Sequence, residues 1–249
     1  EISLQKGQVI KESCRVKPGA YPFAGDPADL FLPRPLDPPT PKPANPLTPT
    51  PVLTISGNNI TVDFQNAELN GGAPGQLPNT FYGVGLVVKG KNITLKNARI
   101  RGYKVALLAE SVEGLTLENC DFSYNYRPRL RSLREREDFS DWLSYHQNDK
   151  GEWLRYGAAI YLNQCARPTV RGCRVTACQN ALLLNGCNDG LLYNNTFQFN
   201  SGLGIGLYRS SRNRLMHNRL DWNVRGYSHG FYQRGQDSDL RNEAMAPVC

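Results

Sequence analysis

A short pattern of alternating apolar and polar residues recurs along the chain between residues 57 and 232. In each copy an apolar-x-apolar stretch, typical of a β-strand, precedes a residue type that tolerates a sharp left-handed bend. We register the copies on one apolar position, which is occupied by Phe64, Leu95, Leu117, Val170, Leu192 and Leu215. The steps between these residues are 31, 22, 53, 22 and 23 residues. A base period of about 22 residues with two insertions predicts a solenoid.

Every copy also carries a bend residue and a further apolar strand. The bend residues are Asn66, Asn97, Asn119, Gly172, Asn194 and His217. The apolar strands cover residues 85–88, 106–109, 159–162, 181–184, 204–207 and 230–233. Three short strands and three turns per period predict a coil of a parallel β-helix, with coils about 4.8 Å apart. A leucine-rich repeat is disfavoured, because it would place Asn three residues after the Leu-x-Leu pair and follow it with a helix.

With this period and this Asn bend, the chain resembles the right-handed parallel β-helix proteins, the pectin-lyase-like superfamily with its bacterial β-helix-repeat members. The resemblance covers residues 52–235. It implies an all-β solenoid of about six coils. It leaves the activity open, because this fold carries lyases, hydrolases, epimerases and inert adhesins.

We expect a single domain over residues 1–249. Residues 1–25 are predicted to cap the first coil, and residues 26–51, which hold 10 of the 17 prolines, to form an excursion outside the sheets. Coils then occupy residues 52–235, with an insertion at 125–156, and 236–249 form a tail. The last coil has no predicted cap. Three explanations stay open for this coil: the tail covers it, a second chain covers it by end-to-end self-association, or the chain is a fragment of a longer β-helix. We favour the fragment.

The composition limits the partners and the location. A formal net charge of +7 favours an acidic partner, for which an acidic polysaccharide, a membrane surface and nucleic acid all qualify. Scattered basic residues without a recognised motif argue against nucleic acid. No apolar run is long enough to span a membrane. The first residue is Glu rather than Met, which is compatible with a removed signal peptide but does not show one. We expect a secreted or periplasmic protein.

The seven cysteines are expected to be structural. Cys120 and Cys173 share one repeat position and are interpreted as small buried residues. Cys165 and Cys187 lie 22 residues apart, at the same turn of adjacent coils. This separation allows a disulfide between them, so both a disulfide and two free thiols remain alternatives. The absence of a CxxC pair argues against a zinc site.

The outward residues of the third strands are the candidate substrate surface. In the lyases that the chain resembles, the substrate cleft lies on the corresponding sheet and is walled by the loops that precede its strands. This position nominates a floor of Tyr161, Asn163, Asn185, Tyr208, Tyr232 and Arg234. The nominated wall residues are His146, Arg155 and His229.

The chemistry that this set supports is β-elimination or epimerisation at a uronic acid. The predicted catalytic residues are Tyr161, Tyr208, His146 and Arg234. The predicted substrate-binding residues are Asn163, Asn185, Tyr232, Arg155 and His229. Hydrolysis is disfavoured, because it needs a pair of carboxyl groups and the outward columns supply only Glu110.

We predict no cofactor and no metal site, although Glu137, Asp138 and Asp141 leave a Ca²⁺ ion open. The first hypothesis is therefore a polysaccharide lyase. The alternatives are a β-helix that binds glycan without turning it over, and a fragment whose working residues lie in other coils.

Overall fold

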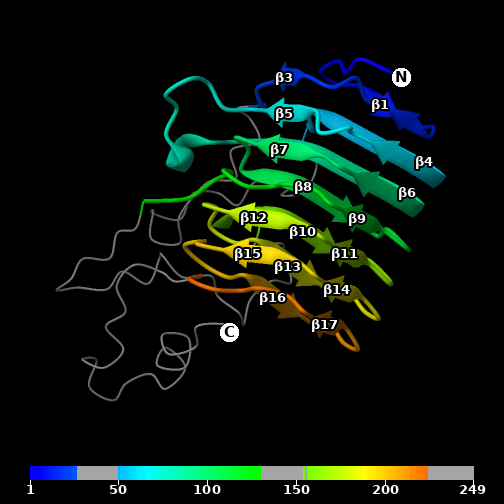
Figure 1. Ribbon diagram of the computed structural model, residues 1–249, viewed down its shortest axis with the longest axis vertical. Coiled ribbons are helices and arrows are strands. Elements are labelled where there is room, and N and C mark those ends of the chain that lie inside the picture. The colour runs from blue at the N-terminus through cyan, green and yellow to red at the C-terminus, as the bar shows by residue number, and fades with distance from the viewer. Residues whose placement is uncertain (27–49, 130–153, 155, 224–249) are drawn as a thin grey trace, which may run out of the picture.

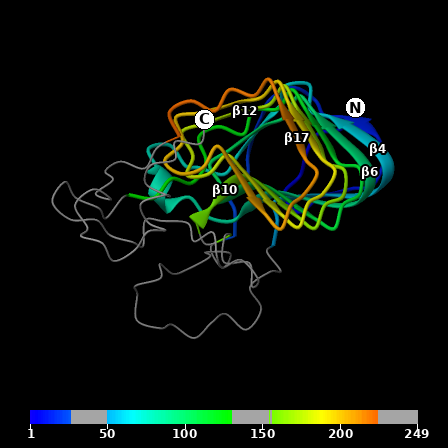
Figure 2. The same cartoon turned by 90° about the horizontal axis from the view of Figure 1, so that it is seen from below.

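The structure is a computed structural model, and it describes residues 1–26, 50–129, 154 and 156–223. Short strands stack rung upon rung along one axis, from the blue N-terminal layer to the orange last coil (Figure 1). Seen from below, the coils curl round a shared interior (Figure 2). The predicted all-β solenoid is confirmed.

The largest sheet contains 12 strands among the described residues, all paired in parallel with their neighbours. Its strands are β1 (Val9–Ile10), β2 (Cys14–Arg15), β4 (Leu53–Asp63), β6 (Val84–Lys96), β8 (Val105–Glu110), β9 (Thr116–Glu118), β10 (Ala158–Asn163), β11 (Thr169–Arg171), β13 (Leu182–Asn185), β14 (Leu191–Tyr193), β16 (Ile205–Tyr208) and β17 (Arg214–Met216). The strands β4 and β6 are long enough to run through two faces of the coil. They therefore join those faces into one sheet.

Two smaller parallel sheets form the remaining face of the coils. One contains β3 (Ala20–Pro22), β5 (Glu68–Asn70) and β7 (Arg99–Arg101), and the other contains β12 (Arg174–Thr176) and β15 (Thr196–Gln198). A 3₁₀ turn, η2 (Pro78–Thr80), lies in the loop between β5 and β6. Each coil thus runs through three strand positions before it rises to the next.

The register of the coils confirms the repeat, with one correction. Leu95 pairs with Leu117 as the spacing predicts, but its partner in the preceding coil is Val62 rather than Phe64. The first copy contains two extra residues between this strand and its bend, and both Gln65 and Asn66 take a positive φ there. Phe64 is fully buried inside this wider bend. A short motif without a gap could not show this insertion.

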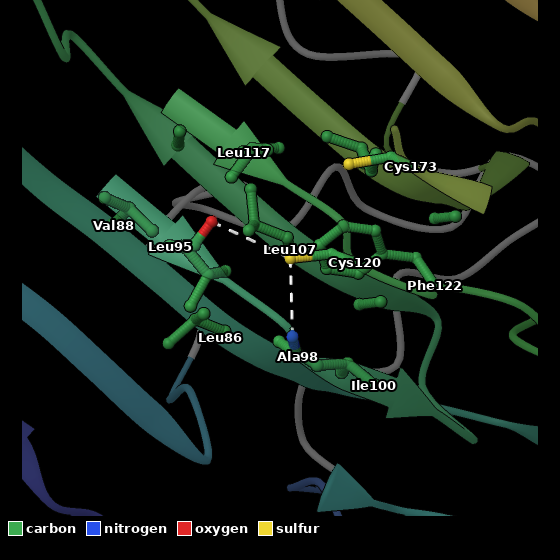
Figure 3. Packing of buried hydrophobic residues seen from close by; sticks show 14 of the residues in the cluster. Leu86, Val88, Leu95, Ala98, Ile100, Leu107, Leu117, Cys120, Phe122 and Cys173 are labelled. Atoms are coloured by element: carbon green, nitrogen blue, oxygen red, sulfur yellow. Dashed lines mark hydrogen bonds between the residues drawn. The ribbon is translucent and has the colours of Figure 1, made fainter. Parts of the chain in front are cut away.

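The interior is a column of aliphatic side chains that repeats from coil to coil. In the close view, Leu86 and Leu107 lie in the same cluster as Leu95 and Leu117 from the neighbouring face (Figure 3). The inward residues predicted for the third strands belong to this core as far as Ile205. Apolar burial along the whole axis therefore stabilises the stack.

Buried Cys and Asn side chains hold the bends between strands. Cys120 Sγ accepts a hydrogen bond from Ala98 N at 3.5 Å and lies 3.8 Å from Leu95 O (Figure 3). One coil further on, Cys173 N donates to Asn195 Oδ1 at 2.9 Å. Cysteine therefore takes the same place in this ladder as asparagine does in later coils.

Cys165 and Cys187 do stack on adjacent coils, with Cys165 N donating to Cys187 Sγ at 3.3 Å. Both thiols are free rather than joined in a disulfide. Cys187 Sγ instead approaches Leu162 O at 3.4 Å, so the backbone supplies the polar partner. The hydrogen bond with the Cys187 thiol, together with burial, raises the pKa of Cys165 well above its ordinary value.

The two ends of the described stack differ. Residues 1–26 form its first layer, in which Ile10 pairs with Ile55 and Ile2 forms a bridge to Val16. Leu4 and Val16 are buried in this layer. In the last described coil, Leu207 and Leu215 are exposed, whereas their counterparts in the coil before are buried. The strand predicted at 230–233 lies outside the described residues.

Candidate functional site

A row of polar side chains crosses the stack directly after the last inward residue of each third strand. We call Lys89, Glu110, Asn163, Asn185 and Tyr208 the polar row. Asn163 pairs with Glu110 on one side and with Asn185 on the other, and Asn185 pairs with Tyr208. The structure therefore brings together three of the predicted site residues, on consecutive coils about 4.8 Å apart.

The centre of the row is ordered by an amide ladder. Asn185 Nδ2 donates to Asn163 Oδ1 at 2.9 Å. This contact leaves the second amide hydrogen of Asn185 and the amide group of Asn163 with further hydrogen-bonding capacity. Both side chains are partly exposed, so they can offer donors and acceptors to a hydroxyl-rich ligand.

Glu110 is the only carboxyl group of the row. Partial burial raises its pKa, and the nearby positive charge of Lys89 opposes this shift. A glutamate whose neutral form is favoured can act as a proton donor closer to neutral pH than an ordinary glutamate. Glu110 and Tyr208 are three coils apart, about 14 Å along the stack, so they do not form an acid–base pair.

Tyr208 ends the row beside a cation. The Arg209 guanidinium lies 5.3 Å from the centre of the Tyr208 ring. Arg209 has φ 48°, and Ser111 and Gln164 take the same left-handed bend at this position of earlier coils. The turn of the β-helix thus places the arginine next to the phenol. Sequence reasoning missed Arg209, although its place directly after the outward column would have indicated it.

The outward face beside the polar row is not an open floor. Val87, Leu108, Tyr161 and Leu183 form one column, as the alternation predicts, but they are buried in a second apolar cluster. Tyr161 is only 1% exposed. Leu154 belongs to the same cluster, and Tyr208 packs against it. The expected exposure of this column was therefore wrong: the column is buried in an apolar cluster that also includes Leu154, from outside the coil strands.

Several predicted site residues lie outside the described residues. They are His146, Arg155, His229, Tyr232 and Arg234. The acidic residues of the insertion, Glu137, Asp138 and Asp141, also lie there. Their roles stay predictions.

The polar row does not assemble the groups for two-carboxylate hydrolysis or for a metal centre. Across residues 1–26, 50–129, 154 and 156–223, no three His, Cys, Asp or Glu side chains gather to hold an ion. The row and the adjoining Arg209 instead combine one phenol, one guanidinium, one ammonium, one carboxyl group and two amides. Such groups can neutralise a carboxylate, hydrogen-bond hydroxyl groups and transfer a proton.

A second surface, which sequence reasoning missed, lies at the bend that precedes the third strand. Tyr124, Phe199 and Trp222 are exposed there, and we call them the aromatic column. Each directly precedes an inward Asn, and the spacing from Phe199 to Trp222 is 23 residues. This aromatic-Asn pair recurs at the coil period, so an alignment of all copies would have found it.

The comparisons with known proteins bear on the fold alone. The right-handed β-helix region family matches residues 82–243, which is more than half of the chain. No curated protein and no solved structure matches the chain. Within the described part of the chain, no helix is long and apolar enough to cross a membrane. The family match, the parallel register and the stacked Asn and Cys bends agree, and the chain belongs to the right-handed β-helix family.

Proposed function

We propose that this protein acts on an acidic polysaccharide, by β-elimination at a uronic acid bound along the polar row. The observation that carries the proposal is the Tyr208 phenol beside the Arg209 guanidinium, at the end of a row of amide side chains. The net charge of +7 also favours an anionic polymer.

In the proposed reaction, Arg209 pairs with the uronate carboxylate and so stabilises the negative charge that develops on deprotonation. A base removes the proton from the carbon that bears the carboxylate, and a C=C bond forms. The C–O bond to the leaving sugar breaks, and Tyr208 donates a proton to the leaving oxygen. His146 is our candidate for the base, and Asn163 and Asn185 hydrogen-bond the sugar hydroxyls.

We propose an extracytoplasmic location, because polymers of uronic acid are found outside the cytoplasm. The proposed steps use protein side chains and need no organic cofactor. A requirement for Ca²⁺ is tested by comparing rates with added calcium and with a chelator.

The test is the ultraviolet absorbance of the unsaturated product, followed over a panel of acidic polysaccharides. Tyr208→Phe and Arg209→Gln each remove one group from the proposed site. Tyr193→Phe serves as the matched control, because Tyr193 lies on β14, a different face of the coil. We expect wild-type protein and the control to produce the signal, and both site variants to lose about 100-fold or more of the rate.

A wild-type rate in the Tyr208→Phe variant would contradict the assigned proton donor. No absorbance change on any substrate would contradict elimination as a whole. The second candidate, a β-helix that binds glycan without turning it over, is favoured by the covered outward column and by the single carboxyl group of the row. A glycan array then identifies its ligand.

Self-association through the last described coil stays a prediction. The exposed Leu207 and Leu215 support it, because apolar side chains at the end of a stack favour a partner surface. Sedimentation over a range of protein concentrations tests it. A single monomer boundary at every concentration would contradict it.

A further inference from the structure

The aromatic column combines three large, exposed rings at one turn of the stack. Tyr124, Phe199 and Trp222 are 54%, 57% and 69% exposed. Tyr124 N donates to Thr176 O at 2.9 Å and Phe199 N to Asp221 O at 3.2 Å, so the residues occupy equivalent positions of their coils. Ala177 fills this position in the coil between Tyr124 and Phe199. Phe199 and Trp222 are therefore one coil apart, about 4.8 Å along the axis.

The fold does not require aromatic side chains at this bend. Tyr124, Phe199 and Trp222 have φ of 61°, 57° and 58°, in the left-handed region that favours glycine and is a steric outlier for bulky residues. Each such backbone costs about 1–3 kcal/mol. Gly102 takes the same bend in the first coil of this series, with φ 79°. Packing does not explain the rings either, because they point to solvent.

The exposed rings of Phe199 and Trp222 do not stack against each other. Although Phe199 and Trp222 lie on adjacent coils, the described part of the chain shows no ring contact between them. Their faces are therefore available for a ligand. Exposed aromatic faces bind planar or weakly polar surfaces such as the C–H faces of sugar rings, and they gain by removing apolar area from water.

A cationic group borders the column. The Arg101 guanidinium lies 5.7 Å from the centre of the Tyr124 ring and also pairs with Glu68. The guanidinium fits a carboxylate.

We propose that the aromatic column is a second glycan-binding site, on which sugar rings of an acidic polysaccharide stack against Tyr124, Phe199 and Trp222. The choice of ligand rests on the proposed function. The column precedes the third strands, whereas the polar row follows them. A third strand of four to six residues spans about 13–20 Å, so only a polymer several sugars long reaches both sites.

The test uses the Phe199→Gly/Trp222→Gly double variant of the full chain. Glycine suits the left-handed bend, so we expect the melting temperature to stay the same or rise. We expect the affinity for long polygalacturonate or alginate chains, measured by isothermal titration calorimetry, to fall about tenfold or more. Affinity for a disaccharide or trisaccharide that reaches only the polar row should not change.

The matched control is Tyr193→Ala, which removes an aromatic ring from β14 on another face. Wild-type affinity in the double variant would overturn the second site and leave the proposed lyase reaction standing. Ring-dependent binding without any unsaturated product would support the second site and overturn the lyase reaction. A lack of binding to any acidic polysaccharide by wild-type protein would overturn both.

Discussion

The Asn ladder is open to a direct test at Asn195, which is fully buried between two coils. Its Oδ1 accepts a hydrogen bond from Cys173 N at 2.9 Å. Its Nδ2 donates to Val170 O at 2.9 Å and to Asn218 Oδ1 at 2.9 Å. The Asn195→Ala substitution removes these three contacts at once.

The expected cost follows from the groups left behind. The Cys173 N–H becomes a buried donor without a partner, which costs about 1–3 kcal/mol. The lost contacts to Val170 O and Asn218 Oδ1 add about 1 kcal/mol, because these oxygens keep some capacity to find other donors. We therefore expect the free energy of unfolding to fall by about 2–4 kcal/mol.

Urea unfolding followed by circular dichroism measures this change. Asn195→Cys is the informative comparison, because Cys120 and Cys173 already hold this position in earlier coils. We expect it to lose less than half as much as alanine does. Asn194→Gly, at the exposed left-handed bend next door, should stay within about 0.5 kcal/mol of wild type. An alanine variant within 1 kcal/mol of wild type would show that the Asn195 hydrogen bonds do not stabilise the stack.

Two further predictions concern titratable groups. Burial raises the pKa of Glu110, so the charged form of this side chain is disfavoured in the folded protein. The neutral form of Glu110 therefore contributes its full stability below the unfolded pKa, and this contribution is lost as the pH rises through the folded pKa. Glu110→Gln should therefore raise the melting temperature at neutral pH, and this gain should disappear in acid. An equal gain at both pH values would contradict the effect of burial on Glu110. Burial also raises the pKa of Cys178 to about 12, so its thiol should resist alkylation at neutral pH until the protein unfolds. Among the six cysteines that the structure describes, the half-buried Cys14 should react first in a mass-spectrometric time course. Early labelling of Cys178 would show that the ladder opens.

The sequence predicted the repeating part of the fold because stacking imposes one environment on each position. Residues such as Leu117 and Val170 meet identical neighbours in successive coils, so the same residue types recur at a fixed spacing. The bend of the first copy escaped prediction because its two extra residues break that spacing.

The candidate site was less predictable than the core. Alternation placed Asn163, Asn185 and Tyr208 correctly in one row, because register depends on local spacing. It could not show that Tyr161 is buried, because that depends on residues from outside the coil, such as Leu154. An outward position on a strand is exposed only where nothing packs over it.

Charged side chains outside the site also follow the stack. Glu118 forms an ion pair with Arg171 of the next coil, with 3.0 Å between the charged atoms. Glu113 forms ion pairs with both Lys91 and Arg167, which lie on the coils on either side of it. Unlike charges that face one another across adjacent coils favour the observed register, because a shifted pairing would separate them. These exposed pairs specify alignment more than they add stability.

The most direct test of the proposed elimination compares an acidic polysaccharide with the same polymer after its carboxyl groups have been reduced to alcohols. The measurement is the ultraviolet absorbance of the unsaturated product with wild-type protein. We expect a rising signal on the uronate polymer and none on the reduced polymer, because the reduced sugar offers no carboxylate to Arg209 and no acidified proton. A flat signal on every uronate polymer, with no heat of binding in calorimetry, would contradict a role in acidic polysaccharide chemistry.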